Sequence, residues 1–243
     1  MGIFDAIFYR PLFNLLVFFY DVVPWNDVGL AIVLVTITIK IILLPFSLKT
    51  LKAQKALQDL QPKMQELQVR YKDNKEKLAQ ATMELYRKEK VNPFSSCLPL
   101  LVQLPFLFAV FRVFRDGFDT SKLDMVYSFI DRPDALNPVS LGFVDLSEPI
   151  LALAVLAGIA QFLQTRMLTH NKQPQTDGSQ DESMAAAMNK NMMYIMPVVT
   201  VIIGASLPGG LTLYWFLFTL LTVVQQYVQF KGESVSDSQK SEQ

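Results

Sequence analysis

Histidine and cysteine are almost absent from this chain of 243 residues, which contains one of each. Cys97 therefore cannot form an internal disulfide, and His170 has no second histidine with which to bind a metal. No Gly-Lys-Ser/Thr loop for nucleotide phosphates occurs, and no nucleophile is paired with a base in the apolar segments. The sequence therefore predicts no enzyme activity, no cofactor and no metal site.

Charged residues are also scarce, at 18% of the chain, whereas hydrophobic residues make up 51%. This composition is typical of a polytopic membrane protein. Five apolar segments are long enough, or nearly so, to cross a hydrocarbon core of about 30 Å as helices. The sequence predicts an all-α membrane protein with five transmembrane helices, at residues 25–48, 91–115, 150–167, 192–207 and 211–230.

Residues 1–24 form a further apolar stretch of a different kind. Charged residues interrupt it, and its apolar residues recur at helical spacing: Phe8, Leu12, Leu15, Leu16, Phe19 and Val22. This pattern is typical of a helix that lies in the membrane interface, so we expect an extracytoplasmic interfacial helix. The alternative is a sixth span, which would leave only residues 24–27 as a turn before the next helix.

The basic residues are concentrated in one connection. Segment 49–90 holds 11 of the 22 Lys and Arg residues against six acidic ones, so the positive-inside rule places it in the cytoplasm. Connection 116–149 holds seven acidic residues and two basic ones, and we expect an extracytoplasmic loop. A cytoplasmic loop at 168–191 and a disordered cytoplasmic tail at 231–243 complete the topology. The N-terminus is then outside and the C-terminus in the cytoplasm.

Segment 49–90 is itself patterned as two helices. Apolar residues repeat in its first half at the spacings of a helix-pairing face, namely Leu57, Leu60, Met64, Leu67 and Tyr71. Residues 72–75 supply a turn, and Pro62 fits the first turn of a helix, so we expect a cytoplasmic helical hairpin with a bend near residues 60–61. The hairpin is either a solvated coiled coil or a docking arm for targeting machinery, an emerging chain or anionic phospholipids.

Lys40 lies about 12 Å from the cytoplasmic end of the first span, at 1.5 Å per residue. A charge at such a depth costs about 2.5–3.5 kcal/mol on insertion scales. No Asp or Glu occurs in the apolar core of any predicted span, so no carboxylate at that depth can pair with it. We therefore expect a water-filled groove open to the cytoplasm. A shifted span that ends at Lys40 is the alternative, and the apolar residues beyond it argue against this: Leu43, Leu44, Phe46 and Leu48.

Further polar residues can line the same groove. Thr36 precedes Lys40 by four residues and lies on the same helix face. The others lie in the second, third and fifth spans: Gln103, Gln161, Gln164, Tyr214 and Trp215. Singly, each is explained by an interhelical hydrogen bond or, for the two aromatic residues, by an interfacial belt. Together with Lys40 they indicate one polar groove.

Several stretches resemble the YidC membrane protein insertase family of the YidC/Oxa/Alb superfamily. They are ITIKIILLPFSLK (37–49), LQPKMQEL (60–67), VNPFSSCLPLLVQLP (91–105), GLTLYW (210–215) and the glutamine pair 225–226. The resemblance covers residues 4–230 and is to a short bacterial form without the large extracytoplasmic domain. The family residue at the position of Lys40 is usually arginine, which has a bidentate fork that lysine lacks.

The resemblance implies a five-helix core with a groove that opens to the cytoplasm and to lipid and is closed to the outside. By this resemblance Lys40, Thr36, Gln164 and Trp215 are groove positions. The implied function is to insert small membrane proteins into the bacterial plasma membrane and to help them fold, without nucleotide hydrolysis.

The resemblance also implies partners. Nascent membrane proteins are the expected substrates, and the ribosome, the signal recognition particle with its receptor and the Sec translocon are further candidates. We expect an active monomer that binds no specific nucleic acid. Two other functions remain open: a small-solute transporter or channel, although no repeat relates the halves of the chain, and an assembly scaffold that does not insert.

Overall fold

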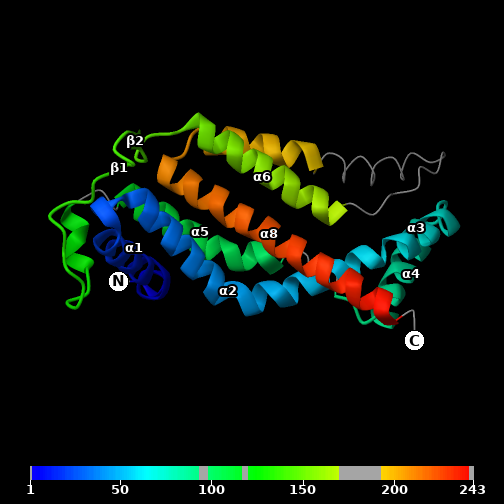
Figure 1. Ribbon diagram of the computed structural model, residues 1–243. Helices are drawn as coiled ribbons and strands as arrows, with labels where there is room; N and C mark the ends of the chain where they lie inside the picture. Colours follow the sequence, from blue (N-terminus) through cyan, green and yellow to red (C-terminus); the bar gives the residue numbers. More distant parts are fainter. Residues whose placement is uncertain (1, 93–97, 117–119, 170–192, 241–243) are drawn as a thin grey trace.

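The computed structural model describes residues 2–92, 98–116, 120–169 and 193–240, and most of them are helical, as predicted (Figure 1). The predicted loop 168–191 falls almost entirely outside the described residues. The helices are α1 (Arg10–Val22), α2 (Val28–Asp59), α3 (Gln61–Arg70), α4 (Lys75–Lys88), α5 (Leu98–Asp116), α6 (Leu151–Thr169), an unlabelled helix (Met193–Gly204) and α8 (Gly209–Lys240). The shorter elements are η1 (Asp5–Tyr9), η2 (Pro24–Asn26), η4 (Thr120–Met125), β1 (Val139–Ser140) and β2 (Val144–Asp145).

The N-terminal helix α1 and the π-helical turn η1 before it pack against α2 and α5. The π geometry occurs where Pro11 follows, because proline has no N–H to give to the carbonyl of Ile7. Arg112 of α5 forms an ion pair with Asp5 of η1, and its guanidinium lies 4.5 Å from the centre of the Tyr9 ring. This pairing holds the N-terminal segment to the end of α5.

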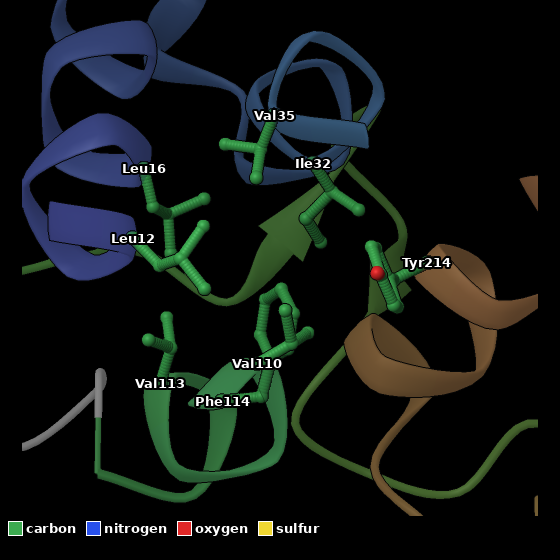
Figure 2. A pocket seen from close by; sticks show the side chains of 8 residues that line it. All are labelled: Leu12, Leu16, Ile32, Val35, Val110, Val113, Phe114 and Tyr214. Carbon is green, nitrogen blue, oxygen red and sulfur yellow. The ribbon is translucent and has the colours of Figure 1, made fainter. Parts of the chain in front are cut away.

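The hydrophobic core lies at one end of the helix bundle, where α2 and α8 begin and α5 ends (Figure 1). Figure 2 shows a small apolar pocket inside this core, bordered by α1, α2, α5 and α8. Tyr214 contributes the one oxygen drawn there, and the other lining side chains are Leu12, Leu16, Ile32, Val35, Val110, Val113 and Phe114. Apolar packing therefore closes this end of the bundle, which we call the core end.

Helix α2 is a single helix of 32 residues that starts at a cap formed by Asp27. The Asp27 carboxylate accepts a hydrogen bond from the Leu30 N–H at 2.9 Å. The predicted first span ends at residue 48, but the helix continues to Asp59. It does so because helix formers such as Leu, Lys, Ala and Gln fill this stretch, and a helix does not need apolar residues to propagate. Pro45 lies inside the helix and removes one backbone hydrogen bond.

Helices α3 and α4 lie side by side and are joined by a turn at residues 71–74 (Figure 1). α3 follows α2 directly with Pro62 in its first turn, and Asn74 caps α4. The Lys63 ammonium donates to a Glu89 carboxylate oxygen at 2.6 Å, and this bond holds the pKa of Glu89 below its usual value. Both side chains are partly exposed, so the pair adds little to stability.

The connection between α5 and α6 is more ordered than the loop that the sequence predicts. Val139–Ser140 and Val144–Asp145 pair as antiparallel strands, which is a small correction to the all-α prediction. The strands form here because Asp27 fixes the turn between them. Its carboxylate accepts bonds from Ser140 Oγ at 2.7 Å and from the Leu141 N–H at 2.5 Å.

Two glycines allow close approach at the core end. A Cβ at Gly29 would meet the Ser140 side chain, and a Cβ at Gly210 would lie 2.8 Å from the Phe114 ring. The Gly210 N–H also donates to the Leu146 carbonyl at 2.8 Å. These contacts bring α2, α5, α8 and the β1–β2 connection together.

Two described helical stretches are long and apolar enough to cross a membrane, namely Val28–Arg70, which includes α2, and Gly209–Gln229 of α8. Two further apolar helices, Leu151–Met167 and Met193–Gly204, are shorter. The count of five spans therefore stays a prediction at this point.

The end of α8 differs from the disordered tail predicted for residues 231–243. The helix continues to Lys240, and no proline interrupts the sequence after Pro208. Residues 241–243 lie outside the described part of the chain.

Asn14 is a buried polar link between α1 and the connection after α5, with 2% of the residue exposed. Its amide donates to the carbonyls of Arg10 at 2.8 Å and Met125 at 3.1 Å, and accepts the Tyr127 N–H at 2.6 Å.

Asn14→Ala should lower the free energy of unfolding by about 1–3 kcal/mol, because it leaves buried backbone groups unpaired. Thermal unfolding in detergent measures this, with the exposed Ser128→Ala as control; equal Tm values for the two variants would contradict the prediction.

Candidate functional site around Lys40

Lys40 lies in the middle of α2, and its side chain is buried against α8, with 8% of the residue exposed. Its ammonium donates a hydrogen bond to Thr222 Oγ1 at 2.7 Å. The same Nζ lies 4.7 Å from the centre of the Phe218 ring, which is a cation–π distance. An ammonium has three N–H donors, so two have no protein partner among the described residues. No described carboxylate pairs with Lys40 either.

The hydroxyls of Thr222 and Thr36 are each bound to their own helix. Thr222 Oγ1 donates to the Phe218 carbonyl at 2.8 Å, which leaves its lone pairs for Lys40. Thr36, one turn before Lys40 on α2, is fully buried and donates to the Ile32 carbonyl at 2.6 Å. Thr222 Oγ1 therefore accepts from the Lys40 ammonium, whereas no hydrogen bond among the described residues joins Thr36 to it.

Tyr214 lies on α8 between Phe218 and the core end, and it is the last polar side chain before the apolar pocket. Its hydroxyl accepts a hydrogen bond from Gln103 Nε2 at 3.0 Å, and the residue is 1% exposed. Its ring centre lies 5.9 Å from that of Phe218, the ring beneath the Lys40 ammonium. Beyond Tyr214 lies the apolar pocket of Figure 2. The site is thus bounded by apolar packing at the core end.

Polar residues of α2 and α8 continue on the other side of Lys40. Ser47 Oγ donates to Gln225 Oε1 at 2.9 Å. Further along the two helices, three glutamines have buried side-chain oxygens without a hydrogen-bond partner among the described residues: Gln54, Gln226 and Gln229. We give the name polar seam to the residues that share a helix register with these two contacts. On α2 they are Lys40, Ser47 and Gln54, seven residues apart, and on α8 they are Thr222, Gln225, Gln226 and Gln229, at positions i, i+3, i+4 and i+7.

The remaining predicted groove residues lie apart from Lys40. Gln161 and Gln164 are half-buried on α6, and Gln161 Nε2 lies 3.5 Å from Thr165 Oγ1, the outer limit of a hydrogen bond. Trp215 is half-buried on α8. No hydrogen bond or ring contact within the described part of the chain joins these three residues to Lys40.

Sequence reasoning missed four residues that contact the site, namely Phe218, Thr222, Ser47 and Gln225. Three of them lie on α8 at spacings of four and three residues, the period of one helix face. That periodicity is a signal that could have found them. Their pairing with Lys40 and Ser47 of α2 depends on contacts across about 180 residues of sequence, which no local pattern reveals.

The groups at this site favour binding over covalent chemistry. Across the described ranges, no three His, Cys, Asp or Glu side chains come together as a metal site. The site offers one ammonium, several hydroxyls and uncharged amides. These groups can bind a carboxylate and hydrogen-bond to a polar chain.

The core end is also fastened by the Asp27 carboxylate, which is 6% exposed. It holds the turn after β1 through Ser140 and Leu141 while it caps α2. The Gly209 N–H donates to the Glu148 carbonyl at 2.9 Å and ties the start of α8 to the same connection. The connection therefore bridges the beginnings of α2 and α8.

These features define a class: a helical membrane protein, closed by apolar packing at one end, that holds a buried cation between two long helices. Comparison with known proteins makes the assignment more specific. The chain belongs to the family described as 60Kd inner membrane protein, whose family model matches residues 18–235.

Relatives in this family carry the name membrane protein insertase YidC. The one from Fusobacterium nucleatum is 39% identical over 206 residues, which cover 85% of this chain and 87% of that protein. YidC 1 from Halalkalibacterium halodurans is 34% identical over 230 residues, which cover 93% of this chain and 78% of that protein. A relative from Endomicrobium trichonymphae is 32% identical, and the match covers 92% of this chain but 40% of that protein.

A solved structure shares the fold. It is described as an active YidC insertase crystal structure with the first transmembrane domain resolved. The TM-score is 0.61 at 25% sequence identity, and the match covers 93% of this chain and 47% of that one. The chain thus matches nearly all of some relatives and less than half of others.

Asp27→Ala should loosen the core end, because it removes the α2 cap and both bonds to the turn at 140–141. Loss of a cap alone costs about 0.5–2 kcal/mol. In a Cys97→Ser background, a cysteine replacing the buried Leu146 should then react several times faster with a membrane-impermeant maleimide. The exposed Asp21→Ala is the matched control, and equal labelling rates in the two variants would show that Asp27 does not fasten the connection.

Proposed function

We propose that this chain inserts small membrane proteins and helps them fold through a hydrated, positively charged groove at Lys40 that opens to the cytoplasm and to lipid. No nucleotide hydrolysis takes part. The observation that carries this proposal is the state of Lys40, which is buried, has no described carboxylate partner and uses one of three donors within the protein. Such a cation attracts a carboxylate from another molecule. The names of the relatives support the same function.

We further propose five spans in a bacterial plasma membrane, with the N-terminus outside and the C-terminus in the cytoplasm. The spans would be α2, α5, α6, Met193–Gly204 and α8, with α1 in the outer interface and α3 and α4 as a cytoplasmic hairpin. The helix directions support this, since α2, α6 and α8 begin at the end of the bundle where α5 finishes (Figure 1). The excess of basic residues in segment 49–90 supports the orientation.

In the proposed mechanism, an acidic segment of the substrate enters from the cytoplasm and pairs with Lys40. Thr222 and the Phe218 ring stabilise the ammonium without neutralising it, so its attraction for a carboxylate is retained. Pairing at this depth shortens the low-dielectric path that the segment must still cross. A membrane potential that is negative inside then favours outward movement by about 2.3 kcal/mol per charge per 100 mV.

The apolar helix of the substrate would move into lipid along α6 and α8. α6 exposes a row of large apolar side chains: Leu151, Val155, Leu156, Ile159 and Leu163. α8 exposes another: Leu220, Val224, Tyr227 and Val228. Lipid solvates such surfaces well, so a substrate helix can lie against them without exposing apolar groups to water. Gln161, Gln164 and Trp215 would border this path.

Nascent membrane proteins are the proposed substrates. The ribosome, the signal recognition particle with its receptor and the Sec translocon are proposed partners, and anionic phospholipids suit the basic segment 49–90. A channel or small-solute transporter is disfavoured, because apolar side chains pack the core end. A scaffold that binds without inserting would use the same surfaces, so only an insertion assay separates it from an insertase.

Lys40→Ala is expected to slow insertion of a single-span substrate with an acidic translocated tail by at least about tenfold, since a charge-assisted hydrogen bond contributes about 1.5–3 kcal/mol. Lys40→Arg should keep most of the activity because it keeps the charge. Protease protection of the tail in proteoliposomes with an imposed potential measures the rate.

The exposed Lys52→Ala on the same helix is the matched control for this change. A substrate whose tail acids are replaced by neutral residues should be inserted equally well by the unaltered protein and by the Lys40→Ala variant. Normal insertion of the acidic substrate by Lys40→Ala would show that this use of Lys40 is wrong. Binding of the substrate without insertion by the unaltered protein would point to the scaffold.

A photo-crosslinking amino acid at Gln164 or Trp215 should capture a stalled nascent membrane protein, because both positions border the proposed path. The same probe at Trp25, which is fully exposed before α2, should give little product. Mass spectrometry of the adducts measures the difference. Equal yields from all three positions would remove the support for a path between α6 and α8.

A further inference from the structure

On the side of Lys40 away from the core end, the polar seam holds more hydrogen-bonding groups than it satisfies. One bond crosses the seam there, from Ser47 to Gln225. Four buried amide atoms have no hydrogen-bond partner in the part of the chain that the structure describes: Gln54 Oε1, Gln225 Nε2, Gln226 Oε1 and Gln229 Oε1. Gln226 is 1% exposed, so its side chain is shut off from bulk water in this conformation. These groups need a partner that the closed seam does not provide.

Unpaired buried amides make this part of the contact between α2 and α8 weak. The core end is different, because apolar packing and the bonds of Asp27 hold it together. Pro45 lies in α2 between Lys40 and Ser47 and removes a helix hydrogen bond at that point. The two helices can therefore separate beyond Lys40, where α8 crosses the far half of α2, while the core end stays closed (Figure 1).

The chemistry of the seam indicates what enters it. A glutamine side chain offers both a donor and an acceptor and carries no charge. A peptide backbone carries the same pair of groups at almost every residue. Glutamines along one groove can thus bind an extended polypeptide without regard to its side chains, and Lys40 alone supplies a charge to select an acidic group.

We propose that the polar seam opens beyond Lys40 and that its glutamines hydrogen-bond to the extended backbone of the entering substrate. The proposal rests on the insertase function proposed above. Lys40 and Gln54 are fourteen residues apart on α2, which is about 21 Å along a helix. An extended chain covers this length with about six residues. The seam therefore binds the stretch that follows an acidic group already at Lys40.

A reversible crosslink across the seam tests whether it opens. In a Cys97→Ser background, Ser47→Cys and Gln225→Cys are joined by a short bis-methanethiosulfonate linker, which reductant removes. We expect the linked protein to insert substrate at least about tenfold more slowly and to recover after reduction. The matched control joins Asp124→Cys to Arg132→Cys, an exposed ion pair of 2.6 Å far from the seam, and should insert normally. Insertion by the seam-linked protein at the unlinked rate would overturn the proposal.

A single substitution tests the hydrogen bonds themselves and remains decisive if the linker does not form. Gln226→Leu removes an unpaired buried amide, so thermal stability should stay the same or rise. Insertion should nevertheless slow by about fivefold to tenfold, because the substrate backbone loses a partner. Gln80→Leu, at an exposed glutamine of α4, should change neither quantity. Unchanged insertion by Gln226→Leu would overturn the role of the glutamines.

The Gln226→Leu and Lys40→Ala variants test the seam and the insertase function separately. Gln226→Leu should slow acidic and neutral tails equally, because backbone bonds do not depend on tail charge. Lys40→Ala should slow the acidic tail only. Failure of the unaltered protein to insert any substrate would refute the proposed function, whereas normal insertion through a linked seam would refute the inference alone.

Discussion

A buried ammonium that pairs with no described carboxylate is the constraint on which this structure depends. A charge at such a depth costs about 2.5–3.5 kcal/mol on insertion scales, and proteins normally offset this with an ion pair. Here the Lys40 ammonium meets a threonine hydroxyl and an aromatic face instead. Neither carries a full negative charge, so the cation is stabilised and still able to bind an anion. A carboxylate at the position of Thr222 would make a firmer contact and would leave nothing with which to attract a substrate.

The two halves of the molecule satisfy their polar groups to different degrees. At the core end, Asn14 and Asp27 each make several hydrogen bonds, and Arg112 has the Asp5 carboxylate. Along the far half of α2 and α8, by contrast, buried glutamine amides lack hydrogen-bond partners within the described ranges. Unpaired buried amides weaken a contact between helices, whereas apolar packing stabilises it. The proposed opening of the far half of α2 and α8, with the core end closed, rests on this difference in pairing.

The sequence predicts the helical class and the depth of Lys40, because hydropathy and helical rise need no knowledge of packing. It does not predict that Thr222 and Phe218 meet Lys40, since that depends on how α8 lies against α2. The ion pair between Arg112 and Asp5 is not predicted either, because it depends on how η1 lies against α5. Hydropathy marks the predicted span only, to residue 48, whereas backbone bonding and helix propensity carry α2 to Asp59. The β1–β2 pair depends on Asp27, which is distant in sequence.

Lysine rather than arginine at position 40 fits a site that must release what it binds. Arginine presents five donors in a planar fork and holds a carboxylate in two parallel bonds, whereas lysine holds it as a point charge. With one donor on Thr222, the Lys40 ammonium keeps two for a passing carboxylate and imposes no fixed plane on it. In the proposed mechanism, a weaker and less directional bond lets the membrane potential draw the acidic segment onward. In that mechanism, the Lys40 side chain both attracts the acidic segment and releases it.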